Sequence, residues 1–282
     1  AAWPAGAEAM TIHWKIYGTD GAEAWTDAPG PSLPGWLDTP VRRAWGAGAA
    51  TAIAAAHRIA PPLDLTPRDP ANAAMLAEQL GATLLPTGSL RLSGPVPQLS
   101  TLPGYAEGAW WVQDAAAALP VRMLGDLRGA RVLDLCAAPG GKTMQLAAAG
   151  AEVTALDVSE ERLARLRQNL DRTGLKAQVI AADALDWRPD GPFHAVLLDA
   201  PCSATGTLRR HPDLPFVRPA PDLAPLLELQ SQLIDRALNW LVPGGLMLYV
   251  TCSLLPAEGE IQASSALARH PGLGPAGLPP PP

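Results

Sequence analysis

The sequence contains only three cysteines in 282 residues and has no run of eighteen apolar residues. No two of these cysteines are close enough for a CxxC metal knuckle, and three cysteines do not form a disulfide framework, so no metal site is predicted. Without a long apolar run, no membrane-spanning helix and no membrane partner are expected. With no signal-type N-terminus either, these features predict a protein of the reducing cytoplasm.

An excess of positive charge is also missing. The net charge of −6 gives no overall attraction to nucleic acid, so any contact with it must come from local groups of basic residues. The hydrophobic fraction of 48% and the chain length are sufficient for one sizeable α/β domain and a smaller one. We therefore expect a globular protein, and a monomer.

The chain divides by composition and pattern into four segments. Residues 1–33 are rich in Ala, Gly, Pro and Trp without periodicity, which predicts a linker or the remnant of a truncated domain. Residues 34–108 predict a small α/β subdomain that begins with a helix in two pieces and contains a second helix between Asp69 or Pro70 and Gly81. Residues 109–262 predict the larger domain, and the Pro/Gly-rich residues 263–282 predict a disordered tail.

From Arg131 onward, short apolar runs alternate with helical segments. The strand-like runs are "RVLDLCAA", "EVTALDV", "AQVIAAD", "HAVLLDAP" and "GLMLYVTCS". Such alternation is typical of a parallel, doubly wound sheet, and strands that are apolar throughout indicate helices on both faces. The predicted fold class is therefore α/β, with a Rossmann-like sheet and a small N-terminal α/β subdomain.

Four of the predicted strands end at aspartates, namely Asp134, Asp157, Asp183 and Asp199. Ligands bind beyond the carboxyl ends of the strands in such sheets, and "CAAPGGKT" after the first strand lets backbone N–H groups approach a ligand. Each feature alone is more often structural, because tight turns need glycine and Asp often caps helices. Together they favour a nucleoside cofactor bound across the sheet edge.

Two missing motifs narrow the choice of cofactor. A phosphate-binding loop GxxxxGK[ST] would need glycine where Cys136 stands, and the loop after the first strand lacks the dinucleotide fingerprint GxGxxG. S-adenosyl-L-methionine has no phosphates and needs only a short glycine turn and an acidic residue for its ribose, a role that suits Asp157. We therefore predict S-adenosyl-L-methionine as the cofactor.

The three cysteines have different settings. Cys136 lies in the first loop and is expected to be buried and inert. Cys202 and Cys252 follow the fourth and fifth strands, which are neighbours in a doubly wound sheet, so both thiols are expected to face one pocket. Two small residues that merely pack there, or a disulfide, are the alternatives, and the disulfide is disfavoured in the cytoplasm.

A methyltransferase has a use for two thiols when the carbon to be methylated is a poor nucleophile. Addition of a thiolate at carbon 6 of a pyrimidine makes carbon 5 an enamine carbon that attacks the methyl group of the cofactor. Elimination then needs a base, and enzyme release needs a second group. Cys202, Cys252 and Asp199 meet these needs, with the carboxyl able to hydrogen-bond the ring nitrogen or the exocyclic amine. Spacing alone does not decide which thiol attacks.

Three segments, "CAAPGGKT", "DAPCSATGTLRRHPD" and "YVTCSLLPAEGEIQ", resemble in order and spacing the Sun/Fmu-type RNA (cytosine-5)-methyltransferases, and most closely the bacterial 16S ribosomal RNA methyltransferase B group. The resemblance covers residues 100–262 and, more weakly, 34–100. It implies that Cys252 is the nucleophile and that Cys202 helps to release the product. It also implies a cofactor site near Arg162 that is lined by Cys136, Ala137, Ala138, Pro139, Gly140, Gly141, Lys142, Asp157, Asp183 and Asp199.

The sequence departs from the pattern of that family at three places. Ala204 stands where the family usually has glycine. Only the tail of the family's N-terminal helical RNA-binding domain fits before residue 60. After Cys252 the family continues into further strands, whereas this sequence gives "ASSALARHPGLGPAGLPPPP". The resemblance therefore predicts a chain shortened at both ends.

RNA, and specifically ribosomal RNA, is the expected partner. The segment "LRRHPD" at 208–213 forms a short basic patch, and five arginines are further candidates for phosphate contacts: Arg42, Arg43, Arg122, Arg128 and Arg131. Trp110 and Trp111 either stack on a base or pack in the interior, and His211 orders its loop. A small-molecule methyltransferase and a non-catalytic RNA-binding remnant are the alternative functions.

Overall fold

The computed structural model describes residues 16–17, 23–24, 33–57, 59–94, 98–210 and 222–276. Its contacts divide the chain into two units. The first unit consists of Ala1–Pro62, Cys202–Leu227 and Cys252–Ile261, and the second consists of Leu63–Pro201, Glu228–Thr251 and Gln262–Pro282.

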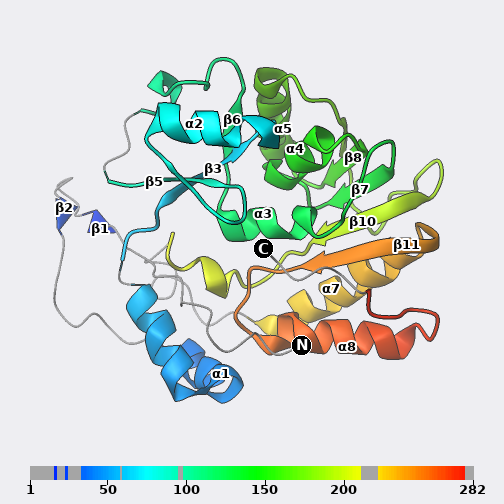
Figure 1. The fold of residues 1–282 in the computed structure, drawn as a ribbon. Coiled ribbons are helices and arrows are strands. Elements are labelled where there is room, and N and C mark those ends of the chain that lie inside the picture. Colours follow the sequence, from blue (N-terminus) through cyan, green and yellow to red (C-terminus); the bar gives the residue numbers. More distant parts are fainter. Residues whose placement is uncertain are drawn as a thin grey trace. The chain divides into compact units, whose positions relative to one another are not determined.

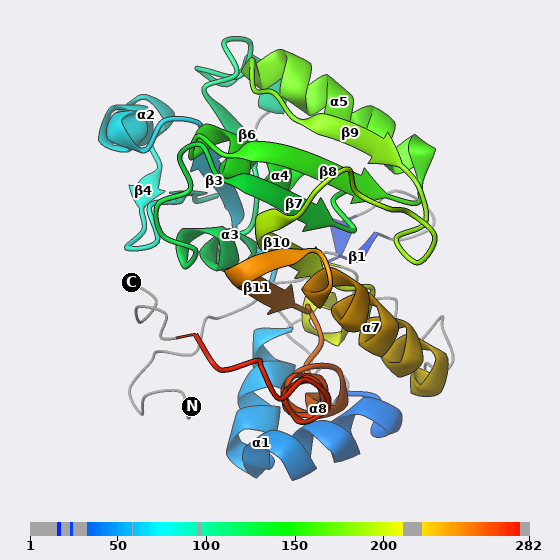
Figure 2. The ribbon, with the colours of Figure 1, turned by 90° about the vertical axis from the view of Figure 1, so that its right-hand side faces the viewer.

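The second unit contains a parallel five-stranded sheet with the strand order β11-β10-β7-β8-β9 (Figures 1 and 2). Its strands are β7 (Arg131–Leu135), β8 (Glu152–Asp157), β9 (Gln178–Ala181), β10 (Phe193–Asp199) and β11 (Leu241–Val250). The chain order reverses between β7 and β10, because β10 returns to pair with the first strand of the sheet. This confirms the predicted doubly wound, Rossmann-like fold.

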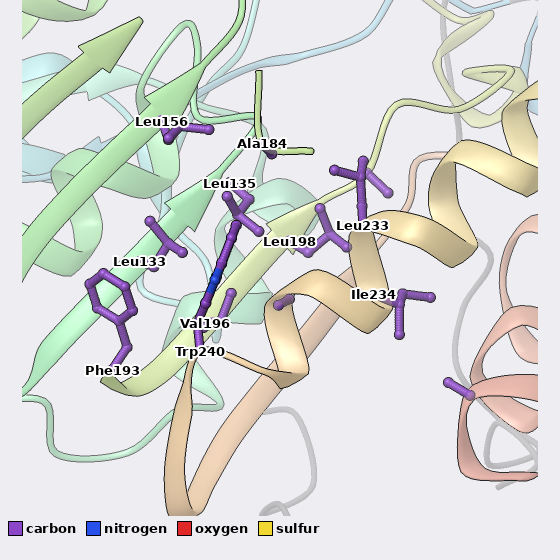
Figure 3. Packing of buried hydrophobic residues seen from close by; sticks show 13 residues of the cluster. Leu133, Leu135, Leu156, Ala184, Phe193, Val196, Leu198, Leu233, Ile234 and Trp240 are labelled. Carbon is purple, nitrogen blue, oxygen red and sulfur yellow. The ribbon is translucent and has the colours of Figure 1, made fainter. Parts of the chain in front are cut away.

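Alternating side chains of the strands enter two apolar layers. On one face, Val132, Val153 and Ala195 pack in one cluster with residues of α3 (Ala115–Arg122) and α4 (Gly141–Ala148). The same face carries α5 (Glu160–Thr173), which packs on Ala155. On the other face, Leu133, Leu135, Val196 and Leu198 lie against Leu233 and Ile234 of α7 (Leu223–Leu238) (Figure 3). Burial on both faces explains why these strands have no polar alternation.

A smaller antiparallel sheet in the same unit has the order β4-β5-β3-β6. It comprises β3 (Leu63–Pro67), β4 (Thr83–Leu84), β5 (Leu90–Leu92) and β6 (Trp110–Val112), with short helices η1 (Pro70–Asn72) and η2 (Leu99–Thr101). Helix α2 (Ala73–Leu80) continues from η1, which Asp69 caps, and ends at the left-handed Gly81, as the sequence predicts.

The predicted subdomain of residues 34–108 differs from what the structure shows at both of its ends. Strand β6 pairs with β3, so the small sheet extends beyond residue 108 to Val112. Helix α1 (Gly35–Ala56) belongs to the first unit and not to the unit of the small sheet. The sequence did not place "WWV" in a strand because three residues carry too little periodicity.

The first unit is built around α1, which is kinked at Gly46 with φ 85° and so forms the expected two helical pieces. Its buried residues Leu37, Val41 and Ala50 share a core with Leu208 and Leu255. Short helices η3 (Thr205–Thr207) and η4 (Pro256–Glu258) lie in the segments that contribute these two leucines. The unit also holds the strand pair β1 (Ile16–Tyr17) and β2 (Glu23–Ala24). Helix α1 therefore supports the segments that follow Cys202 and Cys252.

The tail expected to be disordered from residue 263 is helical in its first part. Helix α8 (Glu260–Arg269) takes in residues 263–269, so the expectation is wrong for them. Arg269 and His270 each contact Oδ1 of Asp235 on α7 at 2.8 Å, and this anchoring is not visible in the composition of the segment. Residues 277–282 lie outside the described part of the chain. Within the described residues, no helix combines the length and apolarity that crossing a membrane requires.

Candidate active site

The loop from β7 to α4 has a backbone that only particular residues allow. Cys136 has φ 58° and Gly140 has φ 103°, so the loop turns through the left-handed region twice. A Cβ atom at Gly140 would lie 2.7 Å from Cγ of Leu166 on α5. Glycine is therefore required at this position both for its conformation and for the close approach of α5.

Asp157 at the end of β8 fixes this loop. Its Oδ2 accepts a hydrogen bond from the Ala138 N–H at 3.1 Å, and its Oδ1 accepts one from the Ser159 N–H at 2.9 Å. Arg162 donates to the Ala138 carbonyl oxygen and lies 3.6 Å from the Asp157 carboxylate. The structure thus brings together the loop, the acidic residue expected to bind ribose, and Arg162.

Asp134 lies on β7, directly before the loop. Its Oδ2 accepts a hydrogen bond of 2.6 Å from the Thr143 hydroxyl, and its Oδ1 has no partner among the described residues. Burial raises the pKa of Asp134 to about 7, against the lowering effects of Thr143 and Lys142. This carboxyl is therefore poised between its neutral and charged forms near neutral pH.

Lys142 and Asp199 form an ion pair at the neighbouring strand end. Nζ of Lys142 donates to Oδ2 of Asp199 at 2.6 Å, and the lysine side chain is only 12% exposed. The pair joins the first turn of α4 to the end of β10. Asp183 differs from these residues, because β9 ends at Ala181 and Asp183 is an exposed residue whose Oδ1 accepts from the Leu185 N–H at 2.8 Å. It therefore follows the strand by two residues and does not end it.

The thiol of Cys136 is unsuited to chemistry. Burial, reinforced by Asp157, Asp134 and Asp199, raises the pKa of Cys136 to about 12. A thiol with such a pKa is almost entirely protonated at neutral pH and is a weak nucleophile. This agrees with the inert role that the sequence predicts for it.

The other two cysteines meet in the first unit. The Cys202 and Cys252 sulfur atoms are 3.3 Å apart, close enough for one thiol to donate a hydrogen bond to the other sulfur. Cys252 is exposed, whereas Cys202 is half-buried. The two thiols expected to face one pocket are thus close neighbours, and the more accessible sulfur is that of Cys252.

A buried glutamate that the sequence analysis did not single out lies beside this pair. Glu258 is fully buried, and its carboxylate accepts hydrogen bonds from Ser203 and Ser253. It stands within the quoted segment "YVTCSLLPAEGEIQ". Its place in this segment, six residues after the candidate nucleophile Cys252, was the sequence signal that could have identified it.

Two buried glutamines that the sequence analysis did not single out form a chain of hydrogen bonds to the backbone just after β10. Nε2 of Gln230 on α7 donates to the carbonyl oxygen of Pro201 at 2.9 Å, and Nε2 of Gln262 on α8 donates to Oε1 of Gln230 at 3.3 Å. Both glutamines are buried, and Pro201 directly precedes Cys202. A glutamine on a helix face gives no sequence signal that separates this role from plain surface exposure.

The residues expected to touch RNA have varied settings. Trp110 and Trp111 are 0% and 2% exposed, so both pack in the interior rather than present a face to a base. Three arginines are paired with carboxylates at 2.6–2.7 Å, namely Arg42 with Asp38, Arg128 with Asp126 and Arg131 with Asp190. Burial lowers the pKa of Arg122, and Arg43 is exposed. His211 lies outside the described residues.

Residues 121–275, which are more than half of the chain, match the family model described as 16S rRNA methyltransferase RsmB/F. The chain belongs to this family. The ribosomal RNA small subunit methyltransferase B of Klebsiella pneumoniae (strain 342) is 46% identical over 188 residues, which are 65% of this chain and 43% of that relative. The enzyme of the same description from Shewanella oneidensis is 40% identical over 250 residues, or 84% of this chain and 58% of that relative.

The solved structures agree with this family. A methyltransferase homolog protein from Pyrococcus horikoshii superimposes with a TM-score of 0.70 at 27% identity, and the match covers 85% of this chain and 83% of that one. The chain spans less than half the length of the Klebsiella relative that it matches.

The cofactor of this family of methyltransferases is S-adenosyl-L-methionine, and the residues present fit it. The molecule carries a positive ammonium and a positive sulfonium, and Asp134, Asp157 and Asp199 supply carboxylates at three adjacent strand ends. The buried Oδ1 atom of Asp134 still lacks a donor within the described residues. Asp157 has lone pairs left for ribose hydroxyls after its two backbone hydrogen bonds.

Proposed function

We propose that this chain transfers a methyl group from S-adenosyl-L-methionine to carbon 5 of a cytosine in RNA, with ribosomal RNA as the substrate. The observation that carries the proposal is the approach of the Cys202 and Cys252 sulfur atoms to 3.3 Å. Methyl transfer to oxygen or nitrogen needs no thiol, whereas transfer to carbon 5 of a pyrimidine needs a nucleophile at carbon 6. The reaction belongs in the cytoplasm, where bacterial ribosomal RNA is made.

The thiolate of Cys252 forms a bond to carbon 6 of the cytosine, and the electron pair of the carbon 5–carbon 6 double bond moves toward the ring nitrogen. We assign to the Asp199 carboxyl a hydrogen bond to the ring nitrogen or the exocyclic amine, which favours this addition. S-adenosyl-L-methionine, when bound, supplies an electrophilic methyl group to carbon 5. Exposure of Cys252 supports its role as the attacking group.

Release of the product requires removal of the proton on carbon 5 and cleavage of the bond between sulfur and carbon 6. In this step the Cys202 thiolate accepts the proton, the electron pair of the carbon–hydrogen bond restores the double bond, and the Cys252 thiolate leaves. We assign to Cys202 a part in this release step, because its sulfur is within hydrogen-bond distance of the leaving sulfur. Cys136 to Lys142, Asp157, Asp183 and Asp199, with Arg162 beside them, are proposed to hold the cofactor.

Substitution of each thiol in turn tests this mechanism. We expect C252A to abolish methyl transfer from labelled cofactor to unmethylated ribosomal RNA, with 5-methylcytosine as the mapped product of the unsubstituted chain. We expect C202A to accumulate a covalent RNA adduct, visible as a gel shift that resists denaturation, and the double variant C202A/C252A to lose it.

Three results would contradict the proposal. Methyl transfer retained in C252A would show that the thiol is not the nucleophile. Label in small molecules but not in RNA would indicate a small-molecule methyltransferase. RNA binding without S-adenosyl-L-methionine binding in calorimetry would indicate a non-catalytic RNA-binding protein.

A further inference from the structure

The Glu258 carboxylate joins the two segments that carry the paired thiols. Its Oε1 accepts from the Ser203 N–H at 2.8 Å, and its Oε2 accepts from the hydroxyls of Ser203 and Ser253, both at 2.5 Å. Ser203 directly follows Cys202, and Ser253 directly follows Cys252. One buried side chain is thus bonded to the neighbour of each thiol.

Further hydrogen bonds hold the same two segments in register. The Thr205 hydroxyl accepts from the Leu254 N–H at 2.8 Å and lies 3.1 Å from the Ser253 hydroxyl. The Gly206 N–H donates to the carbonyl oxygen of Cys252 at 2.8 Å. A Cβ atom at Gly206 would lie 2.7 Å from that oxygen, so the two backbones are in close contact. The segments are therefore fixed against each other over several residues on either side of the sulfurs.

A glutamate is a costly residue for a fully buried position. A buried carboxylate loses its hydrogen bonds to water and needs strong hydrogen bonds from the protein in their place. For Glu258, one N–H and two hydroxyl groups of Ser203 and Ser253 supply these bonds. An apolar residue would fill the same space without the desolvation cost, but it would leave both hydroxyls without this acceptor. The carboxylate therefore contributes a defined geometry between the segments rather than simple packing.

We propose that Glu258 is a positioning residue that sets the distance between the Cys202 and Cys252 sulfur atoms. It acts through Ser203 and Ser253 and does not itself touch RNA or cofactor. The consequence for catalysis rests on the proposed function, since both thiols must act on the same cytosine ring. The geometric part of the proposal does not depend on that function.

The equilibrium between the dithiol and its disulfide in a glutathione buffer measures the sulfur spacing without RNA or cofactor. In this exchange the two protein thiols and one oxidised glutathione give one protein disulfide and two reduced glutathiones, so two electrons pass from protein to glutathione. Formation of a disulfide shortens the distance between the sulfur atoms from 3.3 Å to about 2.0 Å. This small change costs little as long as the two segments keep the sulfur atoms close together. We expect E258A to lower the equilibrium constant by at least about tenfold, or about 30 mV in potential.

Conservative and control variants separate positioning from general stability. E258Q keeps an acceptor for the Ser203 N–H and lets the hydroxyls accept from its amide, so its constant is expected to stay within about threefold of the unsubstituted value. E260Q changes an exposed glutamate two residues further on and should leave the constant unchanged. If E258A does not fold, S203A/S253A removes the two hydroxyl donors with little change in volume and should lower the constant in the same direction.

The outcomes of the two proposals are distinguishable. A constant for folded E258A equal to that of E260Q would overturn the positioning role, even if the melting temperature falls. If the constant falls in E258A while the unsubstituted chain labels no RNA, the positioning role holds and the proposed function fails. If both proposals hold, E258A should lower kcat for RNA methylation with little change in KM for the cofactor. The E258Q variant should then keep most of the kcat of the unsubstituted chain.

Discussion

The Asp134 carboxyl is buried beside the loop from β7 to α4, where a carboxylate is poorly solvated. Its raised pKa means that folding favours the protonated form, whereas the unfolded chain ionises from about pH 4. The stability linked to this group is therefore fully present at low pH and is lost as the pH rises through about 7. The residue therefore lowers the free energy of unfolding near neutral pH.

We expect D134N to become more stable relative to the unsubstituted chain as the pH increases. The asparagine keeps an acceptor for the Thr143 hydroxyl but never carries the buried charge. The difference in unfolding free energy should shift in favour of the variant by up to about 4 kcal/mol between pH 4 and pH 8. Urea unfolding of both chains at these two pH values measures it, and a difference that does not depend on pH would contradict the assignment.

Gly140 offers a second test within the same loop. G140A places a methyl group against Leu166 in addition to the cost of a left-handed alanine, and should lower the unfolding free energy by about 2–3 kcal/mol. Binding of S-adenosyl-L-methionine, measured by calorimetry, should weaken as the loop shifts. G125A is the matched control, because Gly125 has φ 76° and open space around it, so only the conformational cost of about 1 kcal/mol remains. Equal effects of the two substitutions would exclude a role for the Leu166 contact.

The positions of candidate site residues near strand ends and in the loop after β7 were predictable from the sequence, because strand ends and glycine turns leave local signals. Asp134, Asp157 and Asp199 meet at the expected edge of the sheet, and Cys136 has the inert setting that its loop position suggests. Glu258 and Gln230 were not predictable, since their roles depend on contacts with residues about 30 to 55 positions away. The roles of Cys202 and Cys252 remain predictions.

Ala204 shows how local geometry can explain a family preference. It adopts φ 54° at the start of η3, in the left-handed region where glycine has no steric cost. The sequence shows an alanine where the family usually has glycine, and the structure shows that the backbone keeps the conformation that glycine favours. Alanine therefore carries a steric cost at this position that glycine would not carry.

At the level of elements, a buried ion pair connects the small sheet to α3. The carboxylate of Asp64 on β3 accepts from Nε and Nη2 of Arg91 on β5 at 2.8 and 2.9 Å, and from the Ala115 N–H at the start of α3 at 3.1 Å. The Asp64 side chain is 1% exposed and that of Arg91 is 27% exposed. One residue thus fixes two strands and a helix N-terminus.

We expect D64N to lower the unfolding free energy by about 3 kcal/mol, because it removes one member of a buried pair and leaves the Arg91 charge uncompensated. Thermal and urea unfolding measure the loss. D126N is the control, since Asp126 pairs with Arg128 in an exposed setting with side chains 62% and 81% exposed, and should have no measurable effect. A D64N variant as stable as D126N would show that the pair is dispensable.

Elements with strong local patterns were predicted well, and those that depend on distant partners were not. The strands of the large sheet, the helix ending at Gly81 and the two pieces of α1 follow from apolar periodicity, glycine and proline. Strand β6 and the first part of the expected tail were missed because a three-residue strand has little pattern and α8 is anchored by Asp235. Composition alone does not report such anchoring.

At the scale of the whole molecule, affinity for RNA has to arise against a net charge of −6. Three of the five arginines proposed for phosphate contacts are paired with carboxylates, so they add little free positive charge to the surface. The match covers 43% and 44% of the length of the Klebsiella and Salmonella relatives. Contact with RNA must therefore come from local groups of basic residues.

The strand order of the large sheet also has a consequence for the order in which the chain assembles. The residues paired between β7 and β10 are roughly three times as far apart in sequence as those paired between β7 and β8. Closing the longer loop costs about 1 kcal/mol more in chain entropy, so the half built from β7, β8 and β9 has the lower barrier to formation. Cys202 follows β10 and Cys252 follows β11. The two thiols are consequently brought together late, after β7, β8 and β9 have paired.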